Sequence, residues 1–340
     1  MKKDILVTGG LGFIGSHTAV SLVEAGYNPI LLDNLSNSNV GVLDGLEKIL
    51  GERPIFIQGD VNDESLYQRL FTEYNIAAVI HFAAFKAVGE SVAEPLKYYH
   101  NNVVGLVTLL RAMQSGGIDK LVFSSSCTVY GEPDAVPVTE ETPLKPAISP
   151  YGATKQMGEV ILRDLHSVKT QCLRYFNPIG AHPTGLIGEL PLGVPSNLVP
   201  YLTQSVAGLR PPLTIHGNDY PTPDGTCIRD YIHVCDLAEA HVAALKRLLD
   251  GSNENYFEVY NLGTGTGSSV LDVVTTFKEA TGIEPQVQFG PRRPGDVVKV
   301  WADVDLATRK LGWKTKRDLK QMLADAWNWQ KKIGGEGRTV

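Results

Sequence analysis

The chain has 340 residues, of which 43% are hydrophobic and 20% charged, with a formal net charge of −6. This composition is typical of an ordinary globular protein, and the length suits one large domain with a smaller second unit. The acidic balance and the lack of any Lys/Arg block argue against nucleic acid or an anionic membrane as partner. The first apolar stretch, residues 5–7, is too short for a signal-peptide core, and no later run approaches a membrane span. We therefore expect a cytoplasmic protein.

Six short apolar runs bounded by turn residues predict strands at 5–8, 29–33, 55–58, 78–82, 121–124 and 171–175. Helix-like stretches lie between them, and one of these, 101–113, is apolar enough to predict a largely buried helix. Buried strands that alternate with helices are the signature of a parallel sheet covered on both faces. The predicted fold class is α/β, with a doubly wound parallel sheet of the Rossmann type.

The texture of the sequence changes near residue 178, where glycine and proline become frequent up to residue 225. We expect a nucleotide-binding domain over 1–177 and a smaller, loop-rich α/β substrate domain over 178–340. A predicted helix at 236–249 and a strand at 259–261 are suited to return to the sheet. The boundary is therefore expected to be interwoven, with 226–265 partly rejoining the first domain. A closing amphipathic helix is predicted at 319–331.

The four cysteines show neither C-x-x-C spacing nor a Cys/His pattern that would bind metal. They lie in mostly apolar surroundings, which is typical of reduced, buried thiols. We expect no disulfide and no structural metal from Cys127, Cys172, Cys227 and Cys235.

A glycine-rich turn, TGGLGFIG, follows the first predicted strand and opens a helix. Gly10, Gly12 and Gly15 permit a tight turn, close approach of a pyrophosphate, and close helix–sheet packing. Asp33 ends the second predicted strand, where a carboxylate accepts hydrogen bonds from the adenosine ribose and repels a 2′-phosphate. The pattern predicts NAD rather than NADP. Asp60, after the third strand, has two interpretations: an acceptor for the adenine amino group, or a turn and cap residue.

A hydroxyl-rich run, SSSCTVYG, follows the predicted strand at 121–124, so its side chains emerge at the edge of the sheet where such folds bind ligands. Tyr151 and Lys155 lie four residues apart and share one face of a helix. A nearby ammonium and a positive nicotinamide ring would move a phenol of pKa ~10 toward the working range of a base. A bare Y-x-x-x-K also occurs by chance on exposed helices, but the serine run and the glycine turn favour catalysis.

The chain resembles the extended short-chain dehydrogenase/reductase family and, within it, the UDP-glucose/UDP-galactose 4-epimerases. The resemblance covers essentially the whole chain. It is carried by TGGLGFIG, LLDNLSNS, GDVND, VIHFAAFKAVGESV, YYHNNVVG, SSSCTVYG, SPYGATK, LRYFNPIGAHPTG, GNDYPTPDGTCIRDYIHV, YNLGTGTG and PRRPGD. The FAAFK segment departs slightly from the more common version, which has small residues there.

The resemblance implies a role for each matching residue. Tyr151 would be the acid/base on the sugar 4-hydroxyl, Ser126 its hydrogen-bonding helper, and Lys155 the group that holds the nicotinamide ribose. The cofactor-binding set would be Gly9, Gly12, Phe13, Ile14, Gly15, Asp33, Asn34, Asp60, Val61, Phe82, Ala83, Ala84, Lys86, Asn101, Ser124, Tyr151, Lys155 and Tyr175.

For the substrate, a UDP-hexose, the resemblance implies binding through Lys86, Ser126, Tyr151, Asn177, Asn197, Leu198, Thr214, Ile215, His216, Arg229, Arg293 and Asp296. The two arginines would take the diphosphate, because planar guanidinium groups suit phosphate oxygens. Without the resemblance, the sequence favours a surface ion pair for either arginine. Val300 stands where some members of the family place a bulky tyrosine. It is either a gap for an N-acetyl group, which would admit UDP-GalNAc and UDP-GlcNAc, or a core residue.

The implied reaction interconverts UDP-galactose and UDP-glucose through a 4-keto sugar, with NAD kept bound throughout. The resemblance also implies a homodimer formed through helices of the nucleotide-binding domain. Three alternatives stay open at this stage: a 4,6-dehydratase, a UDP-glucuronate 4-epimerase, and a non-catalytic NAD-binding regulator. A dehydratase needs an acid/base pair beside the catalytic serine, where this chain has Cys127 and Thr128.

Overall fold

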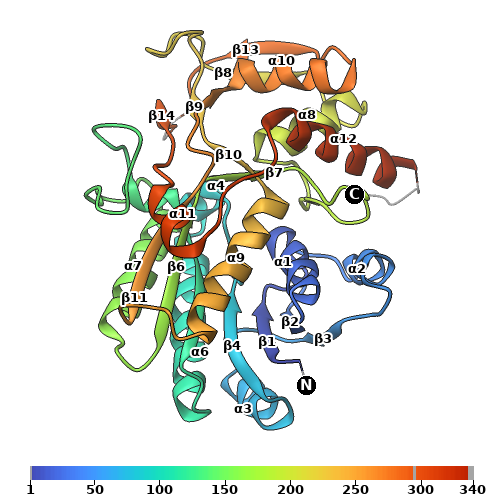
Figure 1. The fold of residues 1–340 in the computed structure, drawn as a ribbon. Helices are drawn as coiled ribbons and strands as arrows, with labels where there is room; N and C mark the ends of the chain where they lie inside the picture. The colour runs from blue at the N-terminus through green and yellow to red at the C-terminus, as the bar shows by residue number, and fades with distance from the viewer. Residues whose placement is uncertain (1, 294–295, 336–340) are drawn as a thin grey trace.

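A seven-stranded parallel sheet forms the centre of the molecule (Figure 1). The computed structural model describes residues 2–293 and 296–335, so Pro294 and Gly295 of the PRRPGD motif lie outside the described residues. The sheet order is β11-β6-β5-β4-β1-β2-β3. Its strands are β1 Asp4–Thr8, β2 Asn28–Asp33, β3 Ile55–Gln58, β4 Ile76–His81, β5 Lys120–Ser126, β6 Lys169–Tyr175 and β11 Phe257–Leu262. The predicted doubly wound fold class is confirmed.

The two faces of the sheet carry separate apolar cores because side chains alternate along each strand. In β1, Ile5 and Val7 contribute to one core and Leu6 to the other. The first core is covered by α1 Phe13–Glu24, α2 Val42–Leu50, α9 Val234–Leu249 and α11 Asp305–Leu311. The second is covered by α3 Glu64–Glu73, α6 Gly105–Ser115 and α7 Pro150–Asp164. Strands buried on both faces explain the continuous apolar runs in the sequence.

The stretch predicted as one buried helix at 101–113 differs from that prediction in two ways. It begins as a π-helical turn, η1 His100–Val104, and continues as α6. Val104 and Val107 are 46% and 38% exposed, so one face of the helix is apolar but not covered by this chain. The apolar pattern of a helix shows that a face is to be buried, but not whether the same chain buries it. The short helices α4 Val88–Ala93 and α5 Pro95–Tyr99 precede it, and a 3-10 turn, η2 Cys127–Tyr130, follows β5.

Helix α9 and strand β11 return to the first unit. Helix α9 packs against α1, and β11 pairs in parallel with β6 at the edge of the sheet, with Phe257 opposite Thr170 and Leu262 opposite Tyr175. The remaining elements form a smaller unit: β7 Asn177–Ile179, α8 Leu198–Val206, β8 Leu213–His216, β9 Ile228–Arg229, β10 Tyr231–His233, β12 Ser268–Ser269, α10 Val270–Thr281, β13 Val287–Gly290, β14 Lys299–Val300 and α12 Leu319–Gly335. Its core lies between α8, α10 and α12.

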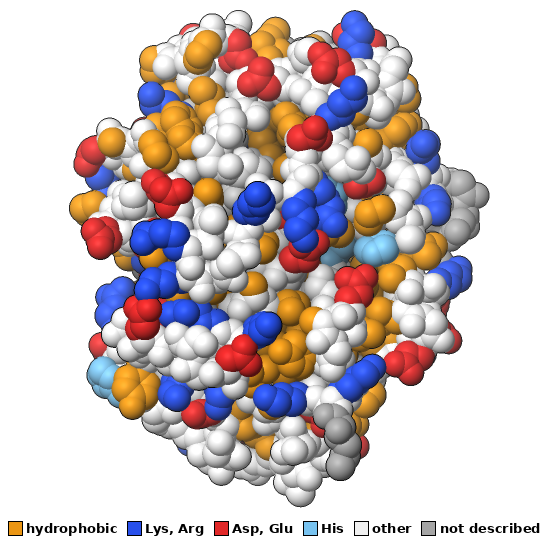
Figure 2. All heavy atoms as spheres, in the orientation of Figure 1, with side chains coloured by type: hydrophobic (Ala, Val, Ile, Leu, Met, Phe, Trp, Pro, Cys, Tyr) orange, Lys and Arg blue, Asp and Glu red, His pale blue; other side chains and the backbone are white. Residues whose placement is uncertain are grey.

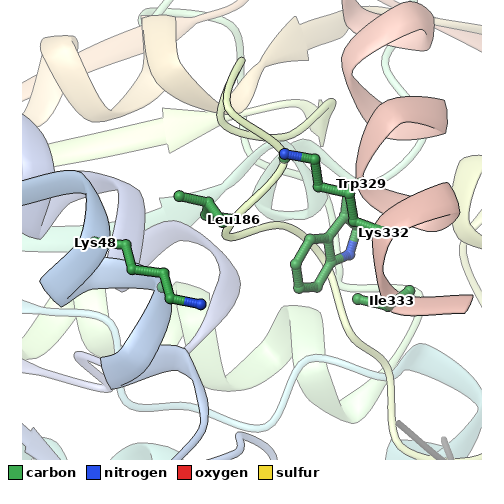
Figure 3. Close-up of a pocket in the computed structure, with 7 residues that line it drawn as sticks. Lys48, Leu186, Trp329, Lys332 and Ile333 are labelled. Carbon is green, nitrogen blue, oxygen red and sulfur yellow. The ribbon is translucent and has the colours of Figure 1, made fainter. Parts of the chain in front are cut away.

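The closing helix α12 also reaches the first unit. Trp329, Lys332 and Ile333 meet Leu186 and Lys48 of α2 around a small cavity (Figure 3). With a volume of about 10 Å³, this cavity has room for no more than one water molecule. The Trp329 indole Nε1 donates to the Glu189 carbonyl at 2.9 Å. The contact therefore anchors the loop that follows β7 rather than forming a ligand site.

The surface mixes charges of both signs. Basic and acidic side chains are interspersed over the face drawn in Figure 2, in keeping with the small net charge of −6. Among the described residues, no helix combines the length and apolar character that a bilayer crossing requires.

Candidate active site

A cavity of about 1040 Å³ lies between the carboxyl edge of the large sheet and the smaller unit. Its walls come from the ends of β1, β2, β5 and β6 on one side and from α8, β8 and the loop after β7 on the other. In open parallel sheets the ligand crevice lies at this edge, where the strand order reverses. Here the order reverses between β1 and β4.

The turn between β1 and α1 forms the floor of the cavity and depends on glycine at two positions. Gly9 adopts φ 70°, and a Cβ there would lie 2.8 Å from the Ala83 nitrogen. A Cβ on Gly15 would lie 2.2 Å from the Gly9 carbonyl oxygen. No side chain caps the N-terminus of α1 at Gly12, so the first turn presents its N–H groups and the positive end of its dipole toward the cavity. This cradle suits a diphosphate.

Asp33 ends β2 beside this cradle and is fixed by three hydrogen bonds. Its Oδ2 accepts from the Leu11 amide at 3.1 Å, and Oδ1 accepts from the Leu35 amide at 2.9 Å and from Ser38 Oγ at 2.8 Å. Asp33 lines the cavity, and its bond to the Leu11 amide holds it against the glycine-rich segment. The local geometry places an acceptor where an adenosine ribose would lie if its diphosphate were bound in the cradle.

Asp60 differs from Asp33, because its carboxylate does not line the cavity, although Gly59 and Val61 do. It accepts from the Asn62 amide at 2.8 Å, from Asn62 Nδ2 at 2.7 Å and from Asn34 Nδ2 at 2.9 Å. Burial acts to raise the pKa of Asp60, but these hydrogen bonds outweigh it and lower the pKa below its ordinary value. Of the two sequence interpretations, the geometry favours the turn and cap role.

Ser124 and Ser126 end β5, and Tyr151 and Lys155 lie in the first half of α7, so four polar side chains meet on one wall of the cavity. Helix α7 begins at Pro150, which is favourable at a first helical position, and Ser149 caps it by accepting from the Gly152 amide at 3.2 Å. Lys155 Nζ donates to the Ser124 carbonyl at 2.7 Å. The Ser124 hydroxyl is hydrogen-bonded to the Tyr175 hydroxyl.

Burial dominates the electrostatics of this wall. It raises the pKa of Tyr151 to about 12, although a hydrogen bond with Ser126 acts in the opposite direction. It lowers the pKa of Lys155 to about 8. The sequence predicted that Lys155 would bring the pKa of the Tyr151 phenol toward neutrality, but among the side chains of this wall desolvation of the phenolate prevails.

The other predicted cofactor residues are brought together around the same cavity. Its lining includes Phe13, Ile14, Asn34, Phe82, Ala83, Ala84, Lys86, Asn101 and Tyr175. The Phe82 ring packs 4.7 Å from His241 of α9, which fixes the start of the FAAFK segment. Lys86 crosses the cavity, where its Nζ lies 2.9 Å from Glu189 Oε1.

The smaller unit supplies the opposite wall, with Asn177, Asn197, Leu198, Thr214, Ile215, His216, Arg229, Arg293 and Asp296 all lining the cavity. The two arginines converge on one carboxylate. Arg293 donates to Asp296 through Nε at 3.1 Å and Nη2 at 2.9 Å, and Arg229 Nη2 lies 3.8 Å from the same group. Two guanidinium groups held side by side at a cavity wall suit an anionic ligand.

Val300 is not among the residues that line the cavity, and of its two sequence interpretations the geometry favours the core residue. Its side chain is 6% exposed and packs with Val129, Phe176 and Ala302 in a small core. A valine is too short to reach beyond this core. Its sequence position alone could not show that, because the depth of a side chain depends on strands β9 and β14, which pair here through Arg229 and Val300.

Several lining residues were not singled out by the sequence. They are Ser36, Asn37, Ser38 and Asn39 after Asp33, the loop residues Glu189, Leu190, Pro191 and Leu192, and Cys127, Tyr201 and Cys227. The LLDNLSNS motif held a signal for the first group, since small polar residues directly follow the acidic strand end. Glu189 had no such signal, because an isolated glutamate in a loop is ordinary. All four cysteines carry free thiols, and burial raises the pKa of Cys127, beside Ser126, to about 12.

Known proteins share both this sequence and this fold. Residues 6–326 match a family model described as GDP-mannose 4,6 dehydratase. The chain is 53% identical over 330 residues to the UDP-glucose 4-epimerase of Bacillus subtilis, covering 96% of each chain. It is 51% identical over 336 residues to UDP-glucose 4-epimerase 2 of Arabidopsis thaliana, covering 97% of this chain and 95% of the relative.

Solved structures agree with this result. A UDP-glucose 4-epimerase from Stenotrophomonas maltophila with bound NAD and formylated UDP-arabinopyranose superposes with a TM-score of 0.95 at 46% identity, covering 98% of this chain and all of the other. The enzyme from Bifidobacterium longum in complex with NAD⁺ and UDP gives 0.93 at 46% identity, covering 98% and 99%. About half of the residues are thus identical, over nearly the full length, to those of proteins named UDP-glucose 4-epimerase. The family model is broader and is named after a dehydratase. The chain belongs to the UDP-glucose 4-epimerases, within the extended short-chain dehydrogenase/reductase family.

Proposed function

We propose that the protein interconverts UDP-galactose and UDP-glucose with a tightly bound NAD. The observation that carries the proposal is one cavity lined by the glycine cradle and Asp33 from the first unit, by Tyr151 from α7, and by Arg229 and Arg293 from the smaller unit. A dinucleotide and a nucleotide sugar both need anion sites, and each unit supplies one to this cavity. Relatives of half-identical sequence bear the name of this activity.

The residues of the first unit fit NAD. The cradle admits a diphosphate only because Gly9 and Gly15 lack side chains, and the Asp33 carboxylate would repel the 2′-phosphate of NADP. The remaining contacts are proposed for Phe13, Ile14, Asn34, Val61, Phe82, Ala83, Ala84, Asn101, Ser124 and Tyr175. Asp60 would contribute indirectly, by fixing the turn that places Val61 at the cavity. When bound, NAD accepts a hydride from the sugar and later returns it.

The chain's own residues would handle the proton and hold the sugar. Tyr151 takes the proton from the 4-hydroxyl, and Ser126 holds that oxygen by a hydrogen bond. Lys155, fixed by the Ser124 carbonyl, supplies positive charge beside the phenol. After the 4-keto hexose has turned its other face to the same wall, Tyr151 returns the proton. Firm binding of UDP by Arg229 and Arg293 with loose binding of the hexose permits that turn.

The remaining substrate contacts are proposed from their position in the cavity. Asn177, Asn197 and Leu198 line the cavity, and we propose that they contact the diphosphate and the sugar. Thr214, Ile215 and His216 of β8 also line it, and we propose that they contact the uridine. Asp296 would accept from the uridine ribose once the diphosphate draws the arginines away from it.

Conversion of UDP-galactose to UDP-glucose by the purified protein, with no nicotinamide added, tests the proposal. We expect turnover, because a cofactor that left during the cycle would strand the ketone. Absence of turnover even with NAD supplied would overturn the proposed substrate. Addition of UDP-glucuronate in the same assay tests the neighbouring activity, for which the cavity would need an extra cation near the hexose.

We also infer a homodimer. Apolar side chains are exposed on the connected helices α4, α5, η1, α6 and α7, where η1 links α6 to the others. They are Val92, Leu96, Val104, Val107, Met157 and Val160, with exposed fractions from 38% to 82%. A patch of this kind is typical of a protein–protein interface. Light scattering on Val107→Lys and Val160→Lys should show monomers, whereas a wild-type monomer would contradict the inference. The cytoplasmic location predicted from the sequence stays a prediction.

A further inference from the structure

A buried ion pair lies directly behind the proposed catalytic wall, and the mechanism above does not use it. Glu159 is fully buried and Arg174 is 2% exposed. Arg174 donates to the carboxylate twice, from Nη2 to Oε2 at 2.6 Å and from Nε to Oε1 at 2.9 Å. Ser125 Oγ also donates to Oε1, at 2.6 Å. Cys172 Sγ adds a weaker donor, 3.5 Å from Oε1. Glu159 thus accepts four hydrogen bonds with almost no access to water.

The pair joins the three elements that carry the proposed catalytic side chains. Glu159 lies one helical turn beyond Lys155 and two turns beyond Tyr151 on α7. Ser125 stands on β5 between Ser124, whose carbonyl holds Lys155, and Ser126. Arg174 precedes Tyr175 on β6. One carboxylate therefore connects the helix of the acid/base to both neighbouring strands.

Stability alone does not account for such a pair. Removing two charges from water offsets most of their attraction, and apolar residues of similar volume commonly stabilise a core as well or better. The chain also has a second pair of similar burial, Arg247 and Glu258, whose side chains are 10% and 8% exposed and which lies away from the cavity. Replacing that pair therefore measures the effect of losing a buried ion pair that does not border the cavity.

We propose that Glu159 is a positioning residue for the acid–base step: held by Arg174, its carboxylate fixes Ser125 and thereby sets the spacing of Ser126 and Lys155 from the Tyr151 hydroxyl. This inference rests on the proposed function. The geometry required by proton transfer is narrow, and a displacement of about 1 Å is enough to lower turnover on the order of a hundredfold. A pair that bonds to β5 and α7 together restricts that displacement.

The charge of Glu159 has a second consequence, for Lys155. The titratable groups that act on the Lys155 ammonium are Tyr151 and Glu159 from α7, His81 from β4 and Cys172 from β6. Burial lowers the pKa of Lys155 to about 8, while Cys172 and Glu159 oppose that fall. Without the Glu159 charge the pKa of Lys155 falls further. Activity is then lost at a lower alkaline pH than in the wild type.

The test replaces the pair as a unit, because Glu159→Gln alone would leave Arg174 buried without its counter-charge and risk unfolding. The double variant Glu159→Met/Arg174→Met is compared with the matched control Arg247→Met/Glu258→Met. The measurements are thermal unfolding, NAD retained after gel filtration, and kcat and KM for UDP-galactose from pH 6 to 10.

We expect the double variant to retain NAD and KM, to lose at least about tenfold in kcat, and to show an alkaline limb moved to lower pH. The control should keep the wild-type kcat and pH profile. Equal effects of the two replacements, or a wild-type kcat and pH profile in Glu159→Met/Arg174→Met, would overturn the proposal. Inactive wild-type protein would instead overturn the proposed function, so the two failures are distinct.

If the double variant does not fold, the single variant Ser125→Ala tests the positioning role instead. It keeps the ion pair and removes only the link to β5. A lower kcat at unchanged KM, with the alkaline limb in place, supports the positioning role. A wild-type kcat in Ser125→Ala would refute it.

Discussion

Lys155 lies one turn from Tyr151 on α7, yet its ammonium is fixed by the Ser124 carbonyl at 2.7 Å and stands 5.9 Å from the centre of the Tyr151 ring. The lysine is thus held by the strand and not by the phenol itself. The action on Tyr151 that we propose for Lys155 would therefore come through its charge and through the nicotinamide ribose, not through a direct hydrogen bond. The pair predicted from Y-x-x-x-K therefore depends on a third group, the Ser124 carbonyl at the end of β5.

Tyr151→Phe should retain NAD and lose turnover by about 10²- to 10⁴-fold, because it removes the group that accepts the proton but keeps the ring. The measurements are the absorbance of bound cofactor and the rate of UDP-galactose conversion. Tyr256→Phe is a matched control, since Tyr256 is 54% exposed and remote from the cavity. Wild-type rates in Tyr151→Phe would remove Tyr151 from its role.

The pH dependence of kcat/KM should have two limbs with opposite origins. Tyr151 acts as a base only when deprotonated, so the rate rises with pH toward its pKa, which burial raises to about 12 and which the positive charge of a bound nicotinamide ring would lower. Lys155 supplies that charge only while protonated, so the rate falls as pH passes about 8. Lys155→Met should move the acid limb to higher pH and abolish the alkaline limb. An unchanged profile in Lys155→Met would show that other groups titrate.

Gly15→Ala should impair retention of NAD. Its Cβ would lie 2.2 Å from the Gly9 carbonyl oxygen, so the cradle must open, at a cost of about 1–3 kcal/mol for overpacking. That cost corresponds to roughly 5- to 150-fold weaker binding, measured by equilibrium dialysis of NAD. Gly334→Ala meets no atom within 4 Å and serves as the control. Equal retention of NAD by the two variants would exclude the cradle as the diphosphate site.

Val300→Tyr tests the acceptance of N-acetylated sugars. A tyrosine cannot fit in the core beside Val129 and Phe176 and must project toward the cavity, which Phe176 also lines. We expect activity on UDP-GalNAc to fall about tenfold relative to UDP-galactose, in the range of a steric contact in an apolar pocket. Val300→Ile, which fills the core without reaching the cavity, should leave the ratio unchanged. A UDP-GalNAc to UDP-galactose activity ratio in Val300→Tyr equal to that of the wild type would refute this hypothesis.

The parts of the site predicted best from the sequence depend on local geometry. The glycine turn, Asp33, and the Tyr151–Lys155 spacing each specify their own backbone within a few residues, and the structure brings them to one cavity. Whether Asp60 faces a ligand or a turn depends on Asn34 and Asn62.

Features that depend on distant pairing were not predictable in this way. The depth of Val300 is set by the pairing of β14 with β9, and the partner of Lys86 is Glu189, more than a hundred residues away. Val104 and Val107 show a further limit: their apolar character indicates burial, but the chain alone does not supply the surface that would bury them.

The return of β11 to the edge of the large sheet has a consequence for synthesis of the protein. The outer edge of strand β6 has unpaired backbone groups until residues 257–262 have been made and β11 can pair with it. About eighty residues emerge from the ribosome between these two strands. During that interval the nascent chain presents an open strand edge, a known template for aggregation. Truncation after residue 177 should therefore yield an aggregating fragment rather than a free-standing nucleotide-binding domain, because the strand that covers the β6 edge is made only after much of the smaller unit has been synthesised.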